Sequence, residues 1–518
     1  MGCSLLAEKD AVIEQLRAEL EQAKAVKAEL DLKHEKLQKK YDRTKNAAAT
    51  YQHMLYGQSS EKSSIEEQTV PAEGETKDTD TPEKPPPSSN RKRGARPGHK
   101  GHGRKIPDNL PVEYRIIEVP EAERFCPVCG RECEEVSLTE DSSELDADIQ
   151  IKLVVTKRKR VKRTCDCKDA GPRFVTAPKP LQAIPKSKFS HNLLSLIIVL
   201  KYMFAIPLNR ILNLFALQNV RISAGSITGA FIKCHALFQP LYQELVKTSK
   251  QEKYWNADET SWMSFTRLHG QNNYLSWMWI FVSKRVILYI WDPSRSSSVP
   301  FKHLGKRAQG FLTADRFSAY KKLLKLIPGL TIAFCWVHFR RDFIRAALGD
   351  KSLEPWAEQW KGRIGEIFQL NKARLKDPAR QKDLEEALAK LEATIAAERK
   401  DPALKEAQHK VLKSAKKHWE GLTVFVNNPR VPMENNVAER HLRVAALGRN
   451  NYYGTHAEWS SHFTAMCLTL TQTARLYGLN PQAYLHYYLD GCAESGGVPK
   501  DLTPYLPWNI KAETLEGK

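Results

Sequence analysis

Five strand-like runs lie between residues 254 and 336, and acidic residues stand within the first run and at the end of the fourth. The runs are rich in aromatic and β-branched residues, which favour strands. Asp258 and Glu259 lie in the first run, and Asp315 ends the fourth. Because neighbouring side chains of a strand point to opposite faces, only one of Asp258 and Glu259 can serve a site on a given face. The pattern predicts a sheet that carries carboxylates.

Three adjacent strands with an acid on the first, followed by a strand that ends in another acid, have the order of a ribonuclease-H-like α/β core. Such a core places carboxylates to hold two divalent ions about 4 Å apart for in-line phosphoryl transfer. The third acid is expected on a later helix. Glu439 fits if Asn435 or Asn436 begins that helix, because Arg443 then shares its face. An ordinary surface helix with an ion pair is the alternative.

The charge of the chain indicates a polyanionic partner. Its 518 residues include 80 Lys and Arg against 60 Asp and Glu, a formal net charge of +20, and residues 171–430 alone carry +22. Such a surplus favours nucleic acid and predicts salt-dependent binding. The apolar stretch 193–208 is too short to span a bilayer and contains Lys201. Because the sequence shows no secretory signal and no cysteine spacing typical of disulfides, we expect a cytoplasmic protein that does not associate with a membrane.

The first 90 residues are predicted to contain an ordered helix followed by a disordered segment. Residues 1–57 show apolar residues at a 3.5-residue period on a charged helix, which favours a coiled coil and self-association over a solvated single helix. Residues 58–90 are acidic and proline-rich with few large apolar side chains, which predicts a disordered linker.

Residues 91–170 predict a basic arm followed by a zinc ribbon. The Gly-rich arm 91–105 and the basic run before Cys165 are candidates for DNA contact. Cys126 and Cys129 form a C-x2-C pair, and Cys165 and Cys167 form a closer second pair that can complete a tetrahedral zinc site. Cys133 is a possible substitute, and a redox pair or unrelated thiols are the alternatives. The predicted DNA-binding residues here are Arg91, Lys92, Arg93, Arg96, Lys100, Arg104, Lys105, Arg158 and Arg160.

Three further regions complete the expected multidomain α+β organisation. Residues 171–250 are expected to form a helical module, in which two short helices around the turn at 220–223 resemble a helix-turn-helix, although packing helices often look the same. Residues 251–470 are expected to form the catalytic core, and 471–518 a C-terminal segment.

An ordered set of motifs along nearly the whole chain resembles the insertion-sequence 66 transposases. It includes RPGHKGHGR (96–104), CPVCG (126–130), NADET (256–260), TADRFSAY (313–320), CWVHFRRDF (335–343), ENNVAERHLR (434–443) and LGRNNYYG (447–454). The resemblance implies an Asp-Asp-Glu triad of Asp258, Asp315 and Glu439 that holds Mg²⁺ or Mn²⁺, and a helical insertion at about 351–425. Glu434 stands where the family commonly has Asp and is a rival third acid.

The motif CWVHFRRDF also holds a metal-like Cys/His spacing, between Cys335 and His338. We expect this pair to serve packing and DNA contact. Arg340 and Arg341 beside it, and Arg440 and Arg443 beside Glu439, are phosphate candidates.

The resemblance implies a DNA transposase that binds element ends and catalyses metal-dependent strand cleavage and strand transfer. A non-catalytic DNA-binding regulator and a metal-dependent nuclease on the same core are the alternatives. Double-stranded DNA, a second copy of the chain and accessory proteins of the same element are the expected partners.

Overall fold

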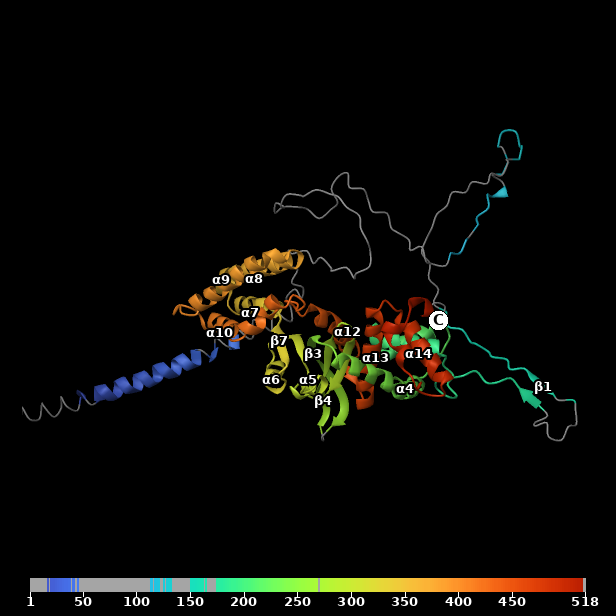
Figure 1. Cartoon of the computed structure of the whole chain (residues 1–518), viewed down its shortest axis with the longest axis horizontal. Helices are drawn as coiled ribbons and strands as arrows, with labels where there is room; N and C mark the ends of the chain where they lie inside the picture. The colour runs from blue at the N-terminus through green and yellow to red at the C-terminus, as the bar shows by residue number, and fades with distance from the viewer. Residues whose placement is uncertain are drawn as a thin grey trace, which may run out of the picture. The chain divides into compact units, whose positions relative to one another are not determined.

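The computed structural model describes residues 16–17, 19–38, 40–41, 44–45, 112–114, 116–121, 124–125, 127–132, 150–162, 164, 174–268 and 271–515 (Figure 1). They fall into two units: one lies within residues 60–149, and the other comprises residues 150–518 together with residues 1–59. The protein combines helices with a central sheet, as an α+β fold does.

A six-stranded sheet forms the centre of the larger unit, in the order β5-β4-β3-β6-β7 with β8 added beside β3. The first three strands are antiparallel, whereas β6, β7 and β8 run parallel to β3 or to one another. The strands are β3 (Tyr254–Leu268), β4 (Gln271–Val282), β5 (Ile287–Asp292), β6 (Gly310–Ala314), β7 (Leu330–Phe334) and β8 (Gly454–Thr455). All five predicted strands are therefore present, and the first extends beyond the predicted run.

The β8 strand reaches β3 because residue 454 is a glycine. A Cβ atom at Gly454 would lie 1.9 Å from the carbonyl oxygen of Met263, so any larger residue would push the two backbones apart. The glycine of the LGRNNYYG motif thus permits a close backbone approach.

The edge strand β5 is covered by helix α13 (Glu458–Leu476). The backbone N–H groups of Tyr289 and Ile287 donate to the hydroxyls of Thr469 (2.9 Å) and Thr473 (3.3 Å) on this helix. Both threonines are fully buried. The threonine-rich segment of α13 is therefore buried because its hydroxyl groups accept the backbone N–H groups that β5 leaves unpaired at the sheet edge.

A second group of helices packs with α13 in one continuous hydrophobic core. It contains α2 (His191–Ile198), which continues into the π-helix Val199–Met203, and then α3 (Leu208–Ala216), α4 (Ala224–Lys250) and α14 (Pro481–Glu494). The prediction of two short helices is wrong for the second, because α4 has 27 residues. Its apolar residues continue at helical spacing through Phe238 and Leu245, which are fully buried. Short 3₁₀ turns follow at Thr503–Tyr505, Pro507–Asn509 and Ala512–Leu515.

Further helices follow the strands β5, β6 and β7 along the chain. Of these, α7 to α10 lie beside β7 (Figure 1). The further helices are α5 (Ser298–Leu304), α6 (Ser318–Leu326), α7 (Trp336–Gly349), α8 (Glu354–Lys376), α9 (Gln381–Glu398), α10 (Glu406–Lys417) and α11 (Trp419–Asn427), with 3₁₀ turns at Lys351–Leu353 and Pro378–Arg380. The stretch 351–425 is helical, as expected. Trp336 and Trp360 are fully buried, and these helices share the hydrophobic core of the sheet.

Smaller elements lie earlier in the chain. Strands β1 (Arg160–Lys162) and β2 (Phe174–Thr176) form a two-stranded antiparallel ribbon, and residues 19–38 are helical with every side chain exposed. The linker 58–90, the basic arm 91–105 and Cys126, Cys133, Cys165 and Cys167 lie outside the described residues. Within the described ranges, no helix is long and apolar enough to cross a membrane.

Candidate active site

The sheet register brings Asp258 and Asp315 side by side. Strands β3 and β6 are parallel neighbours, and Asn256 is paired with Thr313. Asp258 lies two residues beyond Asn256, and Asp315 lies two residues beyond Thr313. Because side chains two residues apart share a face, both carboxyl groups emerge on one face at the carboxyl end of β6. The Asp315 carboxylate also accepts the backbone N–H of Phe317 at 2.9 Å, which fixes the turn after the strand.

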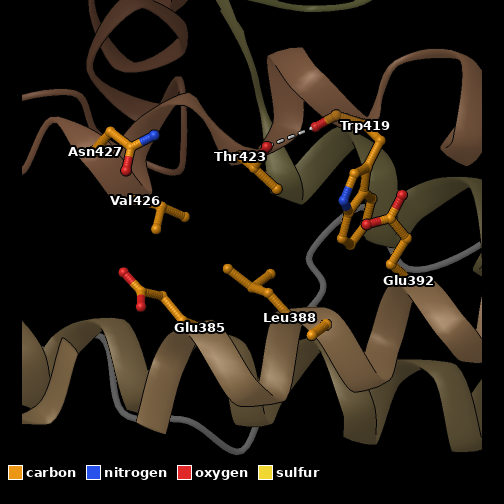
Figure 2. A pocket seen from close by; sticks show the side chains of 8 residues that line it. Glu385, Leu388, Glu392, Trp419, Thr423, Val426 and Asn427 are labelled. Carbon is orange, nitrogen blue, oxygen red and sulfur yellow. Dashed lines mark hydrogen bonds between the residues drawn. The ribbon is translucent and has the colours of Figure 1, made fainter. Parts of the chain in front are cut away.

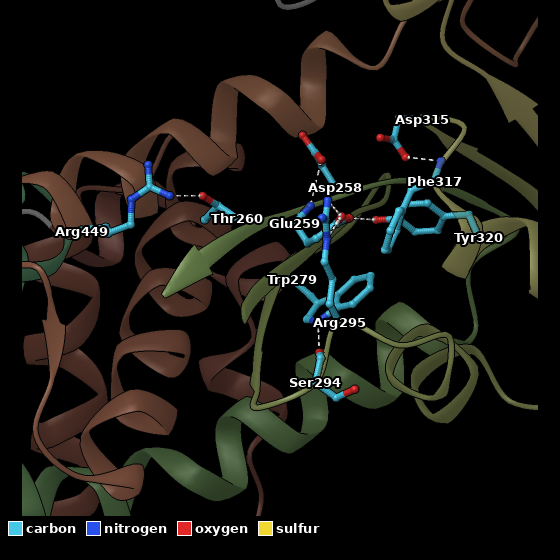
Figure 3. A network of polar contacts seen from close by, with 10 residues as sticks. All are labelled: Asp258, Glu259, Thr260, Trp279, Ser294, Arg295, Asp315, Phe317, Tyr320 and Arg449. Atoms are coloured by element: carbon cyan, nitrogen blue, oxygen red, sulfur yellow. Dashed lines mark hydrogen bonds and ion pairs between the residues drawn. The ribbon is translucent and has the colours of Figure 1, made fainter. Parts of the chain in front are cut away.

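Glu259 points to the other face of β3, where its carboxylate is fully engaged (Figure 3). Arg295 donates two hydrogen bonds to one oxygen (3.0 and 2.8 Å), and the Tyr320 hydroxyl donates to the other (2.7 Å). The Arg295 guanidinium lies 4.4 Å from the Trp277 ring centre and 4.1 Å from that of Phe317. The Glu259 side chain is only 2% exposed. Of the two adjacent acids, Asp258 is thus the one that faces Asp315.

Glu439 comes from helix α12 (Asn436–Tyr452), which begins as the sequence predicts and holds Glu439 in its first turn. A buried amide fixes this helix against β3. The Asn435 side chain donates to the Ala257 carbonyl at 2.8 Å and accepts from the Asn256 side chain at 3.1 Å. Since Asn256 and Asp258 share a face, these bonds hold the start of α12 over the face that carries the two aspartates.

The electrostatics of Asp258 indicate a crowded carboxylate cluster. Burial, the neighbouring Glu259 charge and the charges of Asp315 and Glu439 raise the pKa of Asp258 to about 8, against a lowering effect of the Glu259 backbone N–H. Carboxyl groups that disfavour one another's ionisation in this way are stabilised together by a cation. Oxygen donors of this kind suit Mg²⁺ or Mn²⁺.

The residues that hold the acids in place carry little signal in the sequence. Asn435 is visible only as a possible helix start, and its contacts with β3 join residues 178 and 179 positions apart in the chain. Arg295 lies in none of the quoted motifs, and Tyr320 ends the motif TADRFSAY without any sign that it contacts Glu259. His338, on α7, lies with its Nδ1 3.6 Å from Glu439 Oε1. The spacing of Cys335 and His338 is the local sequence feature that draws attention to His338. It does not indicate the contact with Glu439, and its predicted role is packing and DNA contact.

The predicted DNA-binding residues occupy several surfaces. Arg440 and Arg443 are exposed on α12, and Arg340 and Arg341 are half-buried on α7. Arg341 lies close enough to His338 for its charge to contribute to lowering the pKa of that imidazole, whose main cause is burial. Arg158 and Arg160 lie on or beside the exposed ribbon, where they bond to Ala177 and Thr176. The seven predicted residues of the basic arm lie outside the described part of the chain.

The described residues contain three other candidate sites. Cys129 is exposed, and its three expected zinc partners fall outside the described ranges. His191 and His486 cluster with Asp490, but His191 uses both ring nitrogens: Nδ1 bonds to Asp490 (2.8 Å), and Nε2 accepts the Ala183 N–H (3.0 Å). This cluster joins α2 to α14. The pocket in Figure 2 lies between α9 and α11 and is lined by Glu385, Leu388, Ala389, Glu392, Trp419, Thr423, Val426 and Asn427.

The mixed sheet carries a cluster of carboxylates on its central strands β3 and β6, and comparison with known families gives the class of the protein. Residues 186–462, more than half of the chain, match the Transposase IS66 family. The chain belongs to this family, which implies a transposase that acts on DNA.

Curated relatives from Sinorhizobium fredii extend the similarity beyond that segment. The chain is 25% identical to the uncharacterized protein y4jD over 433 residues, which are 79% of this chain and 82% of that protein. It is also 25% identical to the uncharacterized protein y4hP over 452 residues, 78% of this chain and 76% of that protein.

Proposed function

We propose that the chain is an insertion-sequence transposase that binds element ends, cleaves them and joins their 3′ ends to target DNA. The observation that carries the proposal is the convergence of Asp258, Asp315 and Glu439 from β3, the end of β6 and the first turn of α12. The strand order supports a ribonuclease-H-like core, in which the first strand lies between an antiparallel hairpin and two parallel strands.

The three carboxylates would hold two divalent cations. When bound, such ions would activate the attacking oxygen and stabilise the leaving oxygen of an in-line displacement. Asp258 and Asp315 would share the ions, and Glu439 would complete the second site. Asn435 keeps Glu439 above the strands, while Arg440 and Arg443 face solvent on the same helix and would bind the DNA phosphates.

A strand-transfer assay tests this function. Pre-cut element ends and target DNA are incubated with the full chain and Mg²⁺, and joined product is measured. Asp258→Asn, Asp315→Asn and Glu439→Gln should reduce joining below detection while end binding is retained. Glu434→Gln is the matched control, because this rival acid lies just before α12, and it should join normally.

The same assay separates the alternatives. Cleavage of uncut ends without joining would identify a nuclease, and binding without either reaction would identify a regulator. Joining by Asp258→Asn at the wild-type rate would remove the triad assignment.

We infer that the N-terminal parts of the chain serve assembly and DNA contact. Within the helix of residues 19–38, Leu20, Leu30 and Leu37 are more than half exposed, which supports a coiled coil with a second copy. The bridge between Phe125 and Glu132 closes a turn that contains Cys129, with Gly130 at φ +68°, and this turn supports a zinc-binding loop. The exposed first turn of α4, after the Ser223 cap, supports a helix-turn-helix-like DNA contact. Accessory proteins of the element are further proposed partners.

A further inference from the structure

Two buried polar atoms face each other at the proposed active site, one on His338 and the other on the proposed catalytic residue Glu439. His338 Nδ1 and Glu439 Oε1 are 3.6 Å apart, and neither atom makes a hydrogen bond within the described part of the chain. The separation is too long for a hydrogen bond between them. Since buried polar atoms nearly always have a partner, this pair indicates a third group that both can bind.

The backbone holds His338 in this position from three sides. Helix α7 starts directly beyond β7, and the Cys335 N–H donates to the Ala314 carbonyl at 3.0 Å, next to Asp315. The Trp336 N–H donates to the Met433 carbonyl at 2.8 Å, which joins α7 to the segment before Glu439. Arg316 donates to the His338 carbonyl at 3.2 Å. The imidazole is thus placed by the same elements that place the acids.

Cys335 belongs to the same group of potential ligand atoms, all within 4.8 Å of one another, but its sulfur is already used. The Asn435 N–H donates to Cys335 Sγ at 3.3 Å. Burial raises the pKa of this thiol to about 11, and a neutral buried thiol is a poor metal ligand. The open ligand atoms are therefore those of His338 and Glu439.

The spacing of these two atoms suits a shared cation. Ligand atoms in adjacent positions around a divalent ion with bonds of about 2.1 Å are roughly 3 Å apart. A movement of a few tenths of an ångström would bring His338 Nδ1 and Glu439 Oε1 from 3.6 Å to this distance.

We propose that His338 supplies a nitrogen ligand to the divalent cation that Glu439 holds, so that the second metal site has a mixed nitrogen and oxygen donor set. This inference rests on the proposed function. An imidazole ligand favours the softer Mn²⁺ over Mg²⁺, relative to a site made only of carboxylates.

Pulsed electron paramagnetic resonance of Mn²⁺ bound to the full chain tests the proposal without an activity readout. A directly bound imidazole gives a ¹⁴N coupling in the Mn²⁺ spectrum. We expect this coupling in the wild type and its loss in His338→Asn, with Mn²⁺ affinity reduced about 10- to 100-fold. His486→Asn, which alters the other histidine cluster, is the matched control and should retain both coupling and affinity. His338→Gln replaces His338→Asn if the latter unfolds at a lower temperature than the wild type.

The possible outcomes separate this inference from the proposed function. Tight Mn²⁺ binding that depends on Asp258 and Glu439 but shows no ¹⁴N coupling would overturn the role of His338 alone. Coupling that survives in both His338 variants would do the same, because another nitrogen would then be the ligand. Mn²⁺ binding that is unchanged by Asp258→Asn and Glu439→Gln would overturn the metal site of the proposed function as well.

Discussion

Asp258 and Glu259 are adjacent carboxylates with very different surroundings. Asp258 faces other acids, whereas Glu259 is held by Arg295 and Tyr320. Replacement of Glu259 by Gln leaves Arg295 without its charged partner, so we expect a loss of about 1–3 kcal/mol in the free energy of unfolding. Urea unfolding measures this loss. An unchanged midpoint for Glu259→Gln would show that the network does not stabilise the fold.

Asp258 predicts a pH dependence of stability in buffer without divalent cations. Its pKa is about 8 in the folded protein, chiefly because of burial, and near 4 in the unfolded chain. The stabilisation is complete below about pH 4 and is lost as the pH rises to about 8, because the unfolded chain then releases the proton that the folded protein retains. Asp258→Asn keeps a neutral side chain throughout. Its stability advantage over the wild type should therefore grow by about 1 kcal/mol or more between about pH 5 and about pH 8.

Urea unfolding at both pH values, with chelator present, measures this difference. Parallel pH profiles for the two proteins would show that Asp258 does not lie in a cluster of repelling carboxylates. If the proposed metal site exists, saturating Mg²⁺ should stabilise the wild type more than the variant, because the variant lacks one of the proposed metal-binding carboxylates.

Asn435 and Asn436 form a matched pair for testing what positions Glu439. Asn435 is fully buried and bonds to Ala257 and Asn256, whereas Asn436 is the first helical residue and half-buried. Asn435→Ala would leave the Ala257 carbonyl without this donor and should cost about 2–3 kcal/mol of stability and most of the strand-transfer activity. Asn436→Ala should change stability by less than about 0.5 kcal/mol. Equal effects of the two substitutions would contradict the positioning role.

The sequence is most informative where one residue carries its own signal. An acid in a strand, an acid at a strand end and an acid in a first helical turn are visible locally, whereas the choice of Asp258 over Glu259 and of Glu439 over Glu434 comes from the resemblance to the family. Asn435 and His338 cannot be placed in this way, since their partners are distant in sequence and only the tertiary fold brings them together. The zinc-ligand prediction involves residues beyond the described ranges and stays a prediction.

At the scale of elements, α13 covers the edge of the sheet through hydroxyl groups, and a conservative substitution tests this. Thr469 accepts the Tyr289 N–H of β5, whereas Thr471 bonds to the Cys467 carbonyl of its own helix. Both are fully buried. Thr469→Val leaves a buried N–H without its acceptor and should cost about 1–3 kcal/mol, while Thr471→Val should cost less than about 1 kcal/mol. Thermal or urea unfolding compares the two, and equal costs would contradict the edge-capping role.

Periodicity predicts the elements better than it predicts their lengths. The five strands follow from their aromatic and β-branched runs, and α12 follows from its start. The second helix of the predicted pair is longer than expected, because its polar residues obscure an apolar stripe that continues to Leu245. The threonine-rich part of α13 gives no sign of burial, since its partners are backbone groups of β5.

At the scale of the whole molecule, the charge surplus lies in residues 171–430, and part of it gathers beside the proposed active site. The pKa of Lys321 on α6 is lowered by burial and by the charges of Lys417 and Arg316, which places these cations close together. Arg316 also donates to Ser414 on α10 at 3.2 Å, so α10 reaches the segment that carries Asp315. A group of positive charges next to the acids is where a DNA backbone that enters the site would be held.

The double substitution Lys321→Gln and Lys417→Gln tests whether this basic group binds DNA. Each cation that neutralises a phosphate contributes about 0.9 to the slope of log affinity against log salt concentration, so the double variant should have a slope smaller by nearly two. DNA binding measured from about 50 to about 200 mM salt gives the slope. Lys361→Gln is the control, because Lys361 is paired with Glu358 on α8, and its slope should match the wild type. An unchanged slope in the double variant would show that the DNA does not contact these residues. A reduced slope, together with normal joining at saturating DNA, would show that they bind DNA and take no part in the proposed reaction.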